Sequence, residues 1–413
     1  MNTKSRIAFI HPNLGIGGAE QLVVNLALAL QRKGNYVKIF TSFHDKNHCF
    51  PETRDGTLEI ESITQGIPFM LFNRFFLLIS TIKLILVTLW AIFFGGKFDV
   101  YIVDQNSNVL PLLWLFRKKT IFYLHYPDKL LCQNRASLLK KLYRLVMDFS
   151  EEFSLSFATK ILVNSQYTFG IYRESFKMLE YFKKDAEVLY PAIDFTNFPK
   201  LDAAKSKAIL EKVIQKNRPF FLSLNRYERK KNVGLAIQAF AEFKKRNSGD
   251  NCTLIIAGGY DTNVKENVEY EIELKTLSNK LDVQNEVIFL RSIDHECRLS
   301  LLENCVCVCY TPQNEHFGIV PIEVMYVGRP VICHNSGGPK ESVGKDCGFL
   351  LPEDPKLWAE KLEFFHKNPE ITKKMGVTAR ENVERLFSFS QFMEQSHRIV
   401  CEVVGRSKKG INK

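Results

Sequence analysis

Strand and helix patterns alternate along almost the whole chain, and this alternation limits the folds that it can adopt. Short apolar runs are followed by longer runs with apolar residues at helical spacing. At the start, Arg6 to His11 predicts a buried strand, Gln21 to Arg32 a helix and Tyr36 to Ser42 the next strand. Repeated βα units of this kind predict parallel sheets. The predicted fold class is therefore α/β.

The length of the chain favours two domains, because one core seldom serves 413 residues. Residues 191–205 lack periodicity and are the predicted linker. We expect a Rossmann-like N-terminal domain over 1–195 and a second Rossmann-like domain over 196–385. Residues 386–413 are expected to form a helix that crosses back onto the first domain, followed by a basic tail.

A glycine-rich turn, LGIGGAE at 14–20, joins the first predicted strand to its helix. The turn contains Gly17 and Gly18 and matches part of the dinucleotide-binding fingerprint. No acidic residue closes the second strand, as a dehydrogenase would require to bind a ribose. A dehydrogenase is therefore disfavoured.

Charge and cysteine content restrict the partners and the compartment. The net charge of +11 suits a polyanionic substrate or an anionic membrane surface. Nucleic acid is not expected, because no zinc-finger, helix-turn-helix or RNA-binding motif occurs. Cys305, Cys307 and Cys309 alternate with valine, as on one face of a buried strand, and no C-x-x-C pair is present. These features favour a reducing, cytosol-facing compartment.

The segment from Phe69 to Phe94 is the most apolar part of the chain. It is long enough to cross a bilayer, for which about 20 apolar residues suffice, but Arg74 and Lys83 would make a crossing costly. Strands on both sides of it also belong to one predicted sheet. Arg74, Thr81 and Thr88 recur at helical spacing as one polar edge. We predict a helix in the membrane interface, with both charges reaching the headgroups; a buried core helix and a true span are the alternatives.

The stretch from Thr311 to Lys345 carries the strongest functional pattern. Glu315 lies in a loop that leaves an apolar strand, and Glu323 lies on the short helix that follows. Gly318, at the start of that helix, allows backbone N–H groups to approach an anion. Gly337 and Gly338 are expected to repeat this arrangement after the next strand. Such a loop could hold a phosphate while the carboxylates accept hydrogen bonds from sugar hydroxyls.

Two cations in the second half are suited to a diphosphate. Transfer of a sugar from a nucleotide donor requires the charge of the leaving pyrophosphate to be stabilised. Many such enzymes use a divalent metal held by a D-x-D pair, which this chain lacks. Arg226 and Lys231, in a loop between a strand and a helix, are placed to neutralise the leaving group instead. We therefore expect neither a metal nor another cofactor.

These motifs together resemble the retaining family-4 glycosyltransferases. The resemblance includes EHFGIVPIEVM at 315–325, GRPVIC at 328–333 and GGPKE at 337–341, and it extends over nearly the whole chain. It implies the GT-B architecture, in which two Rossmann-like domains face a cleft. The motifs HYPDKLL at 125–131 and SLNRYERKKN at 223–232 narrow the match to mannosyltransferases of the dolichol-linked oligosaccharide pathway.

The resemblance also implies roles for individual residues. In the family, the positions of Arg226 and Lys231 contact the donor diphosphate, that of Glu315 the transferred sugar and that of Glu323 the ribose. His125 matches a histidine beside the transferred sugar. The residues expected to take part in catalysis are His125, Glu315, Arg226 and Lys231. The residues expected to bind the donor are Gly17, Gly18, Arg226, Lys231, Glu315, Phe317, Gly318, Ile319 and Glu323.

The activity implied by the resemblance is transfer of α-1,3- and α-1,6-linked mannose from GDP-mannose to Man-GlcNAc-GlcNAc-diphosphodolichol. The expected location is the cytosolic face of the endoplasmic reticulum membrane. The expected partners are GDP-mannose, the dolichol-diphosphate-linked oligosaccharide, membrane lipids and other transferases of the same pathway. Two alternatives stay open. One is a family-4 transferase with another lipid-linked acceptor or a UDP-sugar, and the other is a catalytically silent membrane-bound subunit.

Overall fold

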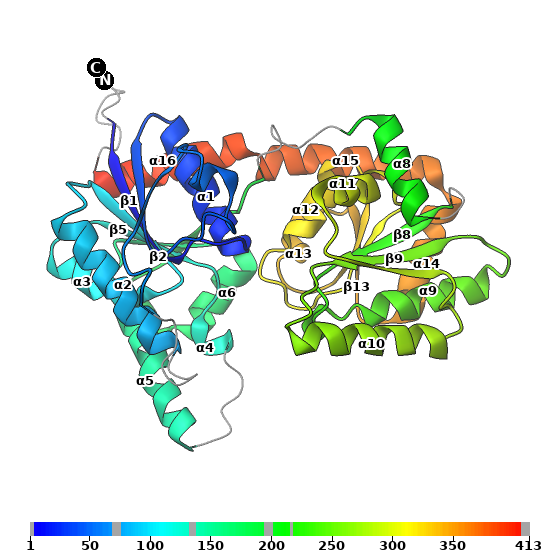
Figure 1. Cartoon of the computed structure of the whole chain (residues 1–413), viewed down its shortest axis with the longest axis horizontal. Helices are drawn as coiled ribbons and strands as arrows, with labels where there is room; N and C mark the ends of the chain where they lie inside the picture. Colours follow the sequence, from blue (N-terminus) through cyan, green and yellow to red (C-terminus); the bar gives the residue numbers. More distant parts are fainter. Residues whose placement is uncertain (1–3, 68–75, 132–137, 194–200, 215–217, 406–413) are drawn as a thin grey trace. The chain divides into compact units, whose positions relative to one another are not determined.

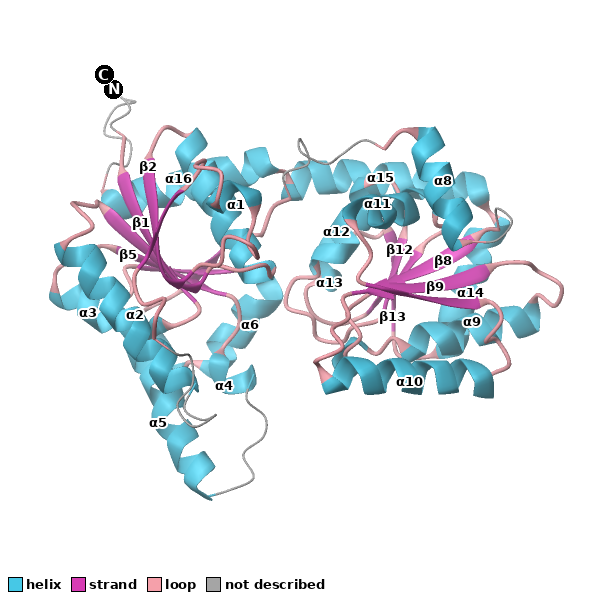
Figure 2. Cartoon of the chain, in the orientation of Figure 1, coloured by secondary structure: helices cyan, strands magenta, loops and turns pink. Residues whose placement is uncertain are grey.

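The computed structural model describes residues 4–67, 76–131, 138–193, 201–214 and 218–405. The chain divides into two compact units. Unit 1 comprises Met1–Asp194 and Ser388–Lys413, and unit 2 comprises Phe195–Phe387. The last helix, red in Figure 1, therefore belongs with the blue beginning of the chain. Each unit is a sheet with helices around it (Figure 2).

The sheet of unit 1 has the strand order β3-β2-β1-β4-β5-β6-β7 among the described residues, and all its pairings are parallel. In register, Ile7 lies opposite Val37 on one side and Val100 on the other. The strands are β1 (Arg6–Asn13), β2 (Tyr36–Phe43), β3 (Glu59–Ser62), β4 (Val100–Asp104), β5 (Thr120–Leu124), β6 (Lys160–Val163) and β7 (Ala186–Val188).

Both faces of the unit 1 sheet are covered by helices. Alternate residues of β1 point to opposite faces, so that Ile7 and Phe9 join one core cluster and Ala8 and Ile10 join another. The described helices of unit 1 are α1 (Gly18–Arg32), α2 (Phe76–Phe93), α3 (Leu110–Leu115), α4 (Asp128–Leu131), α5 (Leu138–Leu155), α6 (Gln166–Ser175), α7 (Lys177–Tyr181) and α16 (Phe389–Val404). Short 3-10 turns are η1 (Pro51–Thr53) and η2 (Ser107–Val109).

Helix α16 is part of the core of unit 1. It packs against α1, and its apolar residues Phe392, Ile399 and Val400 are buried in the same cluster as Ile7 and Phe9. Figure 1 shows the two helices side by side. The end of the chain thus contributes apolar burial to the first unit rather than to the second.

The sheet of unit 2 has the strand order β10-β9-β8-β11-β12-β13, and its pairings are also parallel. The strands are β8 (Phe220–Leu224), β9 (Thr253–Gly258), β10 (Val287–Arg291), β11 (Val308–Tyr310), β12 (Val331–His334) and β13 (Gly348–Leu351). The described helical segments are α8 (Ala203–Val213), η4 (Arg229–Lys231), α9 (Gly234–Arg246), α10 (Lys265–Lys280), α11 (His295–Asn304), α12 (Ile319–Tyr326), α13 (Pro339–Ser342), α14 (Pro355–Lys367) and α15 (Pro369–Phe387).

Helix α8 starts inside the predicted linker, at Ala203, so the linker as predicted is too long at its C-terminal end. The predicted strand at 305–309 is also longer than the observed one, which begins at Val308. Cys305, Cys307 and Cys309 are nevertheless all buried. Their thiols lie in the apolar interior, and burial raises the pKa of Cys307 well above its ordinary value.

Each sheet has one point at which its strand order reverses, between β1 and β4 in unit 1 and between β8 and β11 in unit 2. The loops after the two strands at such a point run in opposite directions and leave a crevice at the carboxyl ends of the strands. Ligands of open α/β sheets bind preferentially there. The loops after β1, β4, β8 and β11 are therefore the expected positions of a ligand site.

Helix α2 corresponds to the apolar segment predicted at 69–94, of which residues 68–75 lie outside the described structure. Its sheet-facing side buries Leu84, Val87 and Ala91 in the core of unit 1. Lys83 is also buried, and its ammonium group donates to the carbonyl of Ile67 at 2.9 Å. The expectation that Lys83 would reach lipid headgroups is therefore wrong. Burial also lowers the pKa of Lys83.

The polar edge predicted for this helix likewise faces the protein. Thr88 is buried and donates to the carbonyl of Leu84, and Thr81 accepts a hydrogen bond from Asn106 at 2.8 Å. The opposite side of α2 is apolar and exposed. None of the helices in the described ranges has the length and apolarity needed to cross a bilayer.

Candidate active site

Glu315 lies in the loop after β11, at the switch point of unit 2, and α12 follows this loop. Gly318 is the N-cap residue of α12 and has a φ of 82°, a left-handed conformation that favours glycine. Phe317 is buried against the ring of Phe387, at 5.7 Å between centroids, which anchors the loop. Ile319 begins the helix and is 40% exposed. The first N–H groups of α12 can therefore meet an anion, with the helix dipole in the favourable direction.

Gly337 and Gly338 support the Glu315 loop and do not form a second copy of it, as the sequence had suggested. The N–H of Gly338 donates to the carbonyl of Glu315 at 2.8 Å. Gly337 has a φ of 67°, and a Cβ atom there would lie 2.3 Å from the carbonyl oxygen of Glu315. Only glycine permits this close approach of the two loops. Because the Gly338 N–H is already bonded, it is not available to an anion.

Lys231 and Glu315 form an ion pair, with 2.6 Å between Nζ and Oε2. Lys231 ends η4, after β8, so the pair joins the two loops that diverge at the switch point of unit 2. The hydroxyl of Thr311 donates to the carbonyl of Lys231 at 2.7 Å and fixes the same loop. Burial alone would raise the pKa of Glu315. The Lys231 ammonium and the Tyr310 hydroxyl lower it by more, so the pKa lies below its ordinary value. The carboxylate is thus an ionised hydrogen-bond acceptor.

Arg226 begins the same loop after β8. Its guanidinium is 61% exposed and pairs with Glu228 at 2.9 Å. The structure therefore brings Lys231, but not Arg226, into contact with Glu315. An exposed guanidinium on a switch-point loop can turn towards an anionic ligand without breaking a buried contact.

Glu323 lies on α12 and is bound by Arg298, a residue that the sequence analysis missed. Nη1 of Arg298 donates to Oε1 at 2.9 Å, and Nη2 donates to Oε2, so the pairing is bidentate. This pairing orients the carboxylate. Arg298 comes from α11, and no local pattern in the sequence connects it with α12.

In unit 1, Gly17 and Gly18 begin α1 at the carboxyl end of β1. Gly17 is the N-cap residue, and a Cβ atom there would lie 2.3 Å from Oε2 of Glu20. Gly18 has open space around its Cα. The turn therefore accommodates the Glu20 carboxylate at Gly17 and leaves the backbone accessible at Gly18.

His125 is linked to a second histidine, His11, through the carboxylate of Asp104. Nε2 of His125 lies 3.1 Å from Oδ2 of Asp104, and Nδ1 of His11 lies 2.7 Å from Oδ1. His11 lies in β1, Asp104 ends β4 and His125 follows β5. The network is therefore at the switch point of unit 1. Sequence reasoning singled out His125 alone. The other two have no motif of their own and are brought to it by the order of the strands.

His11 is doubly protonated in this network. Its Nε2 lies 2.8 Å from the carbonyl oxygen of Asn13, which can only accept, and its Nδ1 faces the carboxylate of Asp104. Burial alone would lower the pKa of His11, but Asp104 and Glu20 raise it to about 10. For Asp104, burial raises the pKa, but the two histidines lower it to about 2. Both geometry and charge therefore describe a buried ion pair.

Asp104 also determines the tautomer of His125. Because an ionised carboxylate only accepts, the Nε2 atom of His125 carries the proton that it donates to Asp104. In the neutral ring, Nδ1 is then the acceptor. In this arrangement the carboxylate orients the imidazole, and Nδ1 can accept a hydrogen bond or a proton.

One group of potential metal ligands occurs within the described ranges, in unit 2. Asp250, Cys252 and His366 offer ligand atoms that all lie within 4.8 Å of one another. Nε2 of His366 lies 2.7 Å from Oδ2 of Asp250, and Nδ1 lies 3.4 Å from the sulfur of Cys252. Cys252 precedes β9, whereas Lys231 and Glu315 follow strands. The group is therefore at the opposite end of the sheet from these two residues.

Comparisons with known proteins agree with this fold. Residues 16–197 match the model of the family described as Glycosyltransferase Family 4, and residues 205–382 match that of Glycosyl transferases group 1. Sucrose-phosphate synthase from Thermosynechococcus elongatus has a TM-score of 0.77 at 21% identity, over 98% of this chain and 100% of that one. WaaG, a glycosyltransferase involved in lipopolysaccharide biosynthesis, has a TM-score of 0.66 at 14% identity, over 96% and 99%.

The fold and the two matched families define a glycosyltransferase with the GT-B fold. The alpha-1,3/1,6-mannosyltransferase ALG2 of Dictyostelium discoideum is 43% identical over 95% of this chain and 97% of its own. The human protein of the same name is 41% identical over 97% of both chains. That of Saccharomyces cerevisiae is 37% identical over 98% of this chain and 86% of its own. The chain belongs to the ALG2 alpha-1,3/1,6-mannosyltransferase family.

Proposed function

We propose that this protein transfers mannose from GDP-mannose to a lipid-linked diphosphate oligosaccharide, forming α-1,3 and α-1,6 linkages. The observation that carries the proposal is the Lys231–Glu315 pair at the switch point of unit 2, in a chain 43% identical to an alpha-1,3/1,6-mannosyltransferase. In the reaction, the bond from the anomeric carbon to the diphosphate oxygen breaks. A bond from the same carbon to the acceptor hydroxyl oxygen forms, GDP departs with the electron pair of the broken bond, and the hydroxyl proton is released to water.

The charges of the site suit this chemistry. Lys231 and Arg226 would neutralise the leaving diphosphate, together with the first N–H groups of α12. Glu315, kept ionised by Lys231, would accept hydrogen bonds from hydroxyls of the transferred mannose. Glu323, oriented by Arg298, would accept from the ribose. In unit 1, Gly17 and Gly18 would approach the diphosphate, and His125 would act beside the transferred sugar.

The decisive test is incubation of the purified protein with GDP-mannose and Man-GlcNAc-GlcNAc-diphosphodolichol, with products resolved by linkage. We expect two added mannoses, one α-1,3 and one α-1,6. UDP-glucose and UDP-N-acetylglucosamine serve as competing donors. Transfer from a UDP-sugar, or to another lipid-linked acceptor only, would favour a different family-4 transferase. The absence of transfer with every donor would favour a catalytically silent subunit.

The two carboxylates of unit 2 should have separable effects. Glu315→Ala should mainly lower kcat, roughly tenfold or more, because its contact is with the sugar that becomes positively charged. Glu323→Ala should mainly raise the KM for the donor, because the ribose does not change in the reaction. Arg298→Ala should resemble Glu323→Ala, since it removes the group that orients the carboxylate. Equal effects of the first two variants on KM alone would contradict this division.

An exposed apolar face on unit 1 supports membrane attachment. Figure 1 shows α2, α3 and α5 on the same side of the unit. Aromatic contacts join them, from Phe93 to Phe116 and from Trp114 through Phe157 to Phe153. The large exposed side chains of this face, which we name the apolar face, are Leu78, Ile82, Leu86, Trp90, Phe93, Trp114, Leu115, Leu142, Leu145, Val146, Phe149 and Phe153.

We propose that the apolar face enters the cytosolic leaflet of the endoplasmic reticulum membrane. Twelve large apolar side chains exposed on three helices are unusual on a freely soluble surface, and their aromatic and aliphatic composition suits an interface with lipid. The net charge of +11 would favour an anionic surface. Attachment by this face would keep the enzyme close to an acceptor anchored by its dolichol.

Two acidic substitutions in the apolar face should weaken membrane binding. In α5, Leu145 is 66% exposed and Phe149 is 60% exposed. The double variant Leu145→Glu/Phe149→Glu should lower the bound fraction in vesicle flotation by about tenfold or more, since each apolar side chain contributes about 1.5–3 kcal/mol on burial. Ile272→Glu, at a position 59% exposed on α10 of unit 2, is the matched control. Equal binding of both variants would contradict the assignment of the face.

A further inference from the structure

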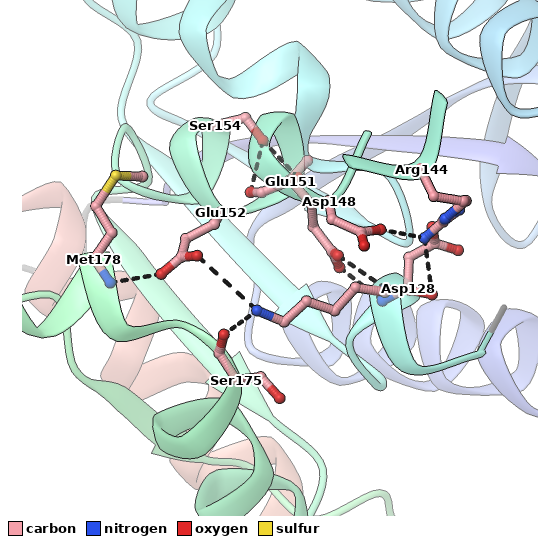
Figure 3. A network of polar contacts seen from close by, with 10 residues as sticks. Asp128, Arg144, Asp148, Glu151, Glu152, Ser154, Ser175 and Met178 are labelled. Carbon is pink, nitrogen blue, oxygen red and sulfur yellow. Dashed lines mark hydrogen bonds and ion pairs between the residues drawn. The ribbon is translucent and has the colours of Figure 1, made fainter. Parts of the chain in front are cut away.

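Helix α5 has a polar side opposite its share of the apolar face. Arg144, Asp148 and Glu151 recur at helical spacing on this polar side, facing α4 (Figure 3). Helix α4 begins at Asp128, three residues after His125. The polar side of α5 therefore lies against the segment that carries the candidate catalytic histidine.

Glu151 holds the start of α4 through two backbone hydrogen bonds. Its Oε1 accepts from the N–H of Asp128 at 2.8 Å, and its Oε2 accepts from the N–H of Lys129 at 3.2 Å. The first N–H groups of a helix have no partner within the helix, and here a carboxylate from another helix satisfies two of them. Glu151 is a residue of α5, and its backbone carbonyl accepts a hydrogen bond from the Ser154 hydroxyl at 3.0 Å.

Arg144 makes a second attachment between the same two helices. Its Nη1 lies 2.9 Å from the carboxylate of Asp128, and its Nη2 donates to the Asp148 carboxylate at 2.6 Å. The side chain of Arg144 is only 5% exposed, whereas that of Asp128 is 39% exposed. Both the backbone and the side chain of Asp128 are thus bound to α5.

The other end of the segment is fixed by different strands. The carbonyl of His125 accepts from Nδ2 of Asn164, which follows β6, at 3.0 Å. Its ring is bonded to Asp104 at the end of β4. Residues 125–128 therefore connect two anchored ends. At the α4 end, Arg144 binds Asp128, and Glu151 binds the backbone N–H groups of Asp128 and Lys129.

We propose that Glu151 is a positioning residue for His125: by binding the two N–H groups that start α4, its carboxylate fixes the segment that carries the imidazole. This proposal rests on the role of His125 in the proposed function. Displacement of a reacting group by about 1 Å can reduce a rate by about a hundredfold, so a small relaxation of α4 would be measurable.

The two hydrogen bonds from α4 to the Glu151 carboxylate should depend on pH close to neutrality. Burial raises the pKa of Glu151 to about 7, although its two N–H donors act in the opposite direction. The charged groups around it are Asp128 and Lys129 on α4, and Arg144, Asp148 and Glu152 on α5. Above this pKa the carboxylate accepts from both N–H groups. Below it, one oxygen carries a proton, and one of the two bonds is weakened. Ordering of the segment should therefore increase as pH rises through 7.

The test compares Glu151→Gln with Glu152→Gln in the full-length protein. Glu152 is the adjacent residue. Its carboxylate accepts from the N–H of Met178 at 2.6 Å and lies 3.9 Å from Nζ of Lys129, but it binds neither of the first N–H groups of α4. At pH 8, Glu151→Gln should lower kcat roughly tenfold or more, with the KM for GDP-mannose within about twofold. The wild type should show a rise of kcat through pH 7, and Glu151→Gln should lose it. Glu152→Gln should retain both the turnover and the pH profile.

Two further measurements separate this proposal from the proposed function. Normal turnover in His125→Ala would overturn the role of His125 and the positioning proposal with it. Loss of turnover in His125→Ala together with a normal kcat and pH profile in Glu151→Gln would overturn the positioning alone. If Glu151→Gln does not fold, amide hydrogen exchange of the wild type decides. Protection of the Asp128 and Lys129 amides should fall between pH 8 and pH 6, and equal protection at both would overturn the proposal.

Discussion

Lys231→Ala should lower kcat by at least about a hundredfold, whereas EDTA should leave the turnover of the wild type unchanged. The ammonium group lies at the switch point of unit 2, where it would stabilise the leaving diphosphate. Removal of this ammonium group would also leave the partly buried Glu315 carboxylate without a cationic partner, and the pKa of Glu315 would rise. Both effects reduce turnover more than donor binding. Arg226→Ala should lower kcat by a similar factor, because its guanidinium is the second cation of the loop that would neutralise the diphosphate.

Lys230→Ala is the matched control for this prediction. Lys230 is next to Lys231 in η4, but its side chain is 69% exposed and pairs with Glu228 at 3.1 Å. Its removal should change kcat by less than about threefold, since exposed ion pairs contribute little. Turnover and product linkage are measured with GDP-mannose in the presence and absence of the chelator. Loss of turnover in EDTA that magnesium or manganese restores would contradict metal independence.

The residues that sequence could identify are those that sit in one local motif. Lys231 and Glu315 each follow a strand, and each was singled out from its own motif. Their contact could be expected only because parallel strands bring their carboxyl ends to one edge. Arg298 could not be predicted in this way. It reaches Glu323 because α11 and α12 are close in space, and an arginine on a helix surface carries no signal of its partner.

The unit 1 network shows the same limit more clearly. His11 lies inside a buried strand, where a histidine reads as part of the core, and Asp104 ends a strand with no acidic motif around it. Their contact with His125 depends on the strand order β1-β4-β5, which places residues 11, 104 and 125 next to one another. A sequence pattern gives the strands but not their order, so the network became visible only in the structure.

Helix α2 was predicted as a helix, but the surroundings of its polar side chains were predicted wrongly. We expected Arg74, Thr81 and Thr88 to form a polar edge, and Arg74 and Lys83 to reach headgroups. In the structure, Thr88 and Lys83 bond to carbonyl groups of Leu84 and Ile67 and are buried. A polar side chain that can satisfy its hydrogen bonds internally need not face water, and periodicity alone does not distinguish the two cases.

Stability of unit 1 should decrease as pH rises from about 6.5 to about 10, and His11 should account for the decrease. The pKa of His11 is about 10 in the folded protein and 6.5 ordinarily, so folding favours its protonated form. The corresponding stability is fully present below pH 6.5 and is lost as pH rises through the folded pKa. Since each pKa unit corresponds to about 1.4 kcal/mol, the loss is on the order of a few kcal/mol. On the acidic side, the stability that the pair contributes depends on Asp104. Because its pKa is about 2 in the folded protein, the carboxylate stays ionised down to strongly acidic pH.

The measurement is urea unfolding of the wild type and of His11→Asn at pH 6 and pH 9. The free energy of unfolding should fall between these values in the wild type and should fall by clearly less in the variant. His44→Asn is the matched control, because His44 is another buried histidine of unit 1 and burial lowers its pKa. Its titration therefore lies below pH 6.5, and the variant should keep the wild-type dependence between pH 6.5 and pH 10. An equal pH dependence in wild type and His11→Asn would show that His11 is not charged in the folded protein.

Asp104→Asn should be the most damaging single change in unit 1. It removes the only carboxylate that contacts both imidazoles in the described network. The buried His11 cation is then left with the more distant carboxylate of Glu20, at 3.8 Å. Removal of one partner of a buried pair costs about 3–5 kcal/mol, so the variant should unfold at markedly lower urea concentration at pH 6. At pH 9, where the His11 proton is more easily released, the difference from the wild type should be smaller. This convergence distinguishes a lost charge pair from a lost packing contact, because a packing defect would cost the same at both pH values.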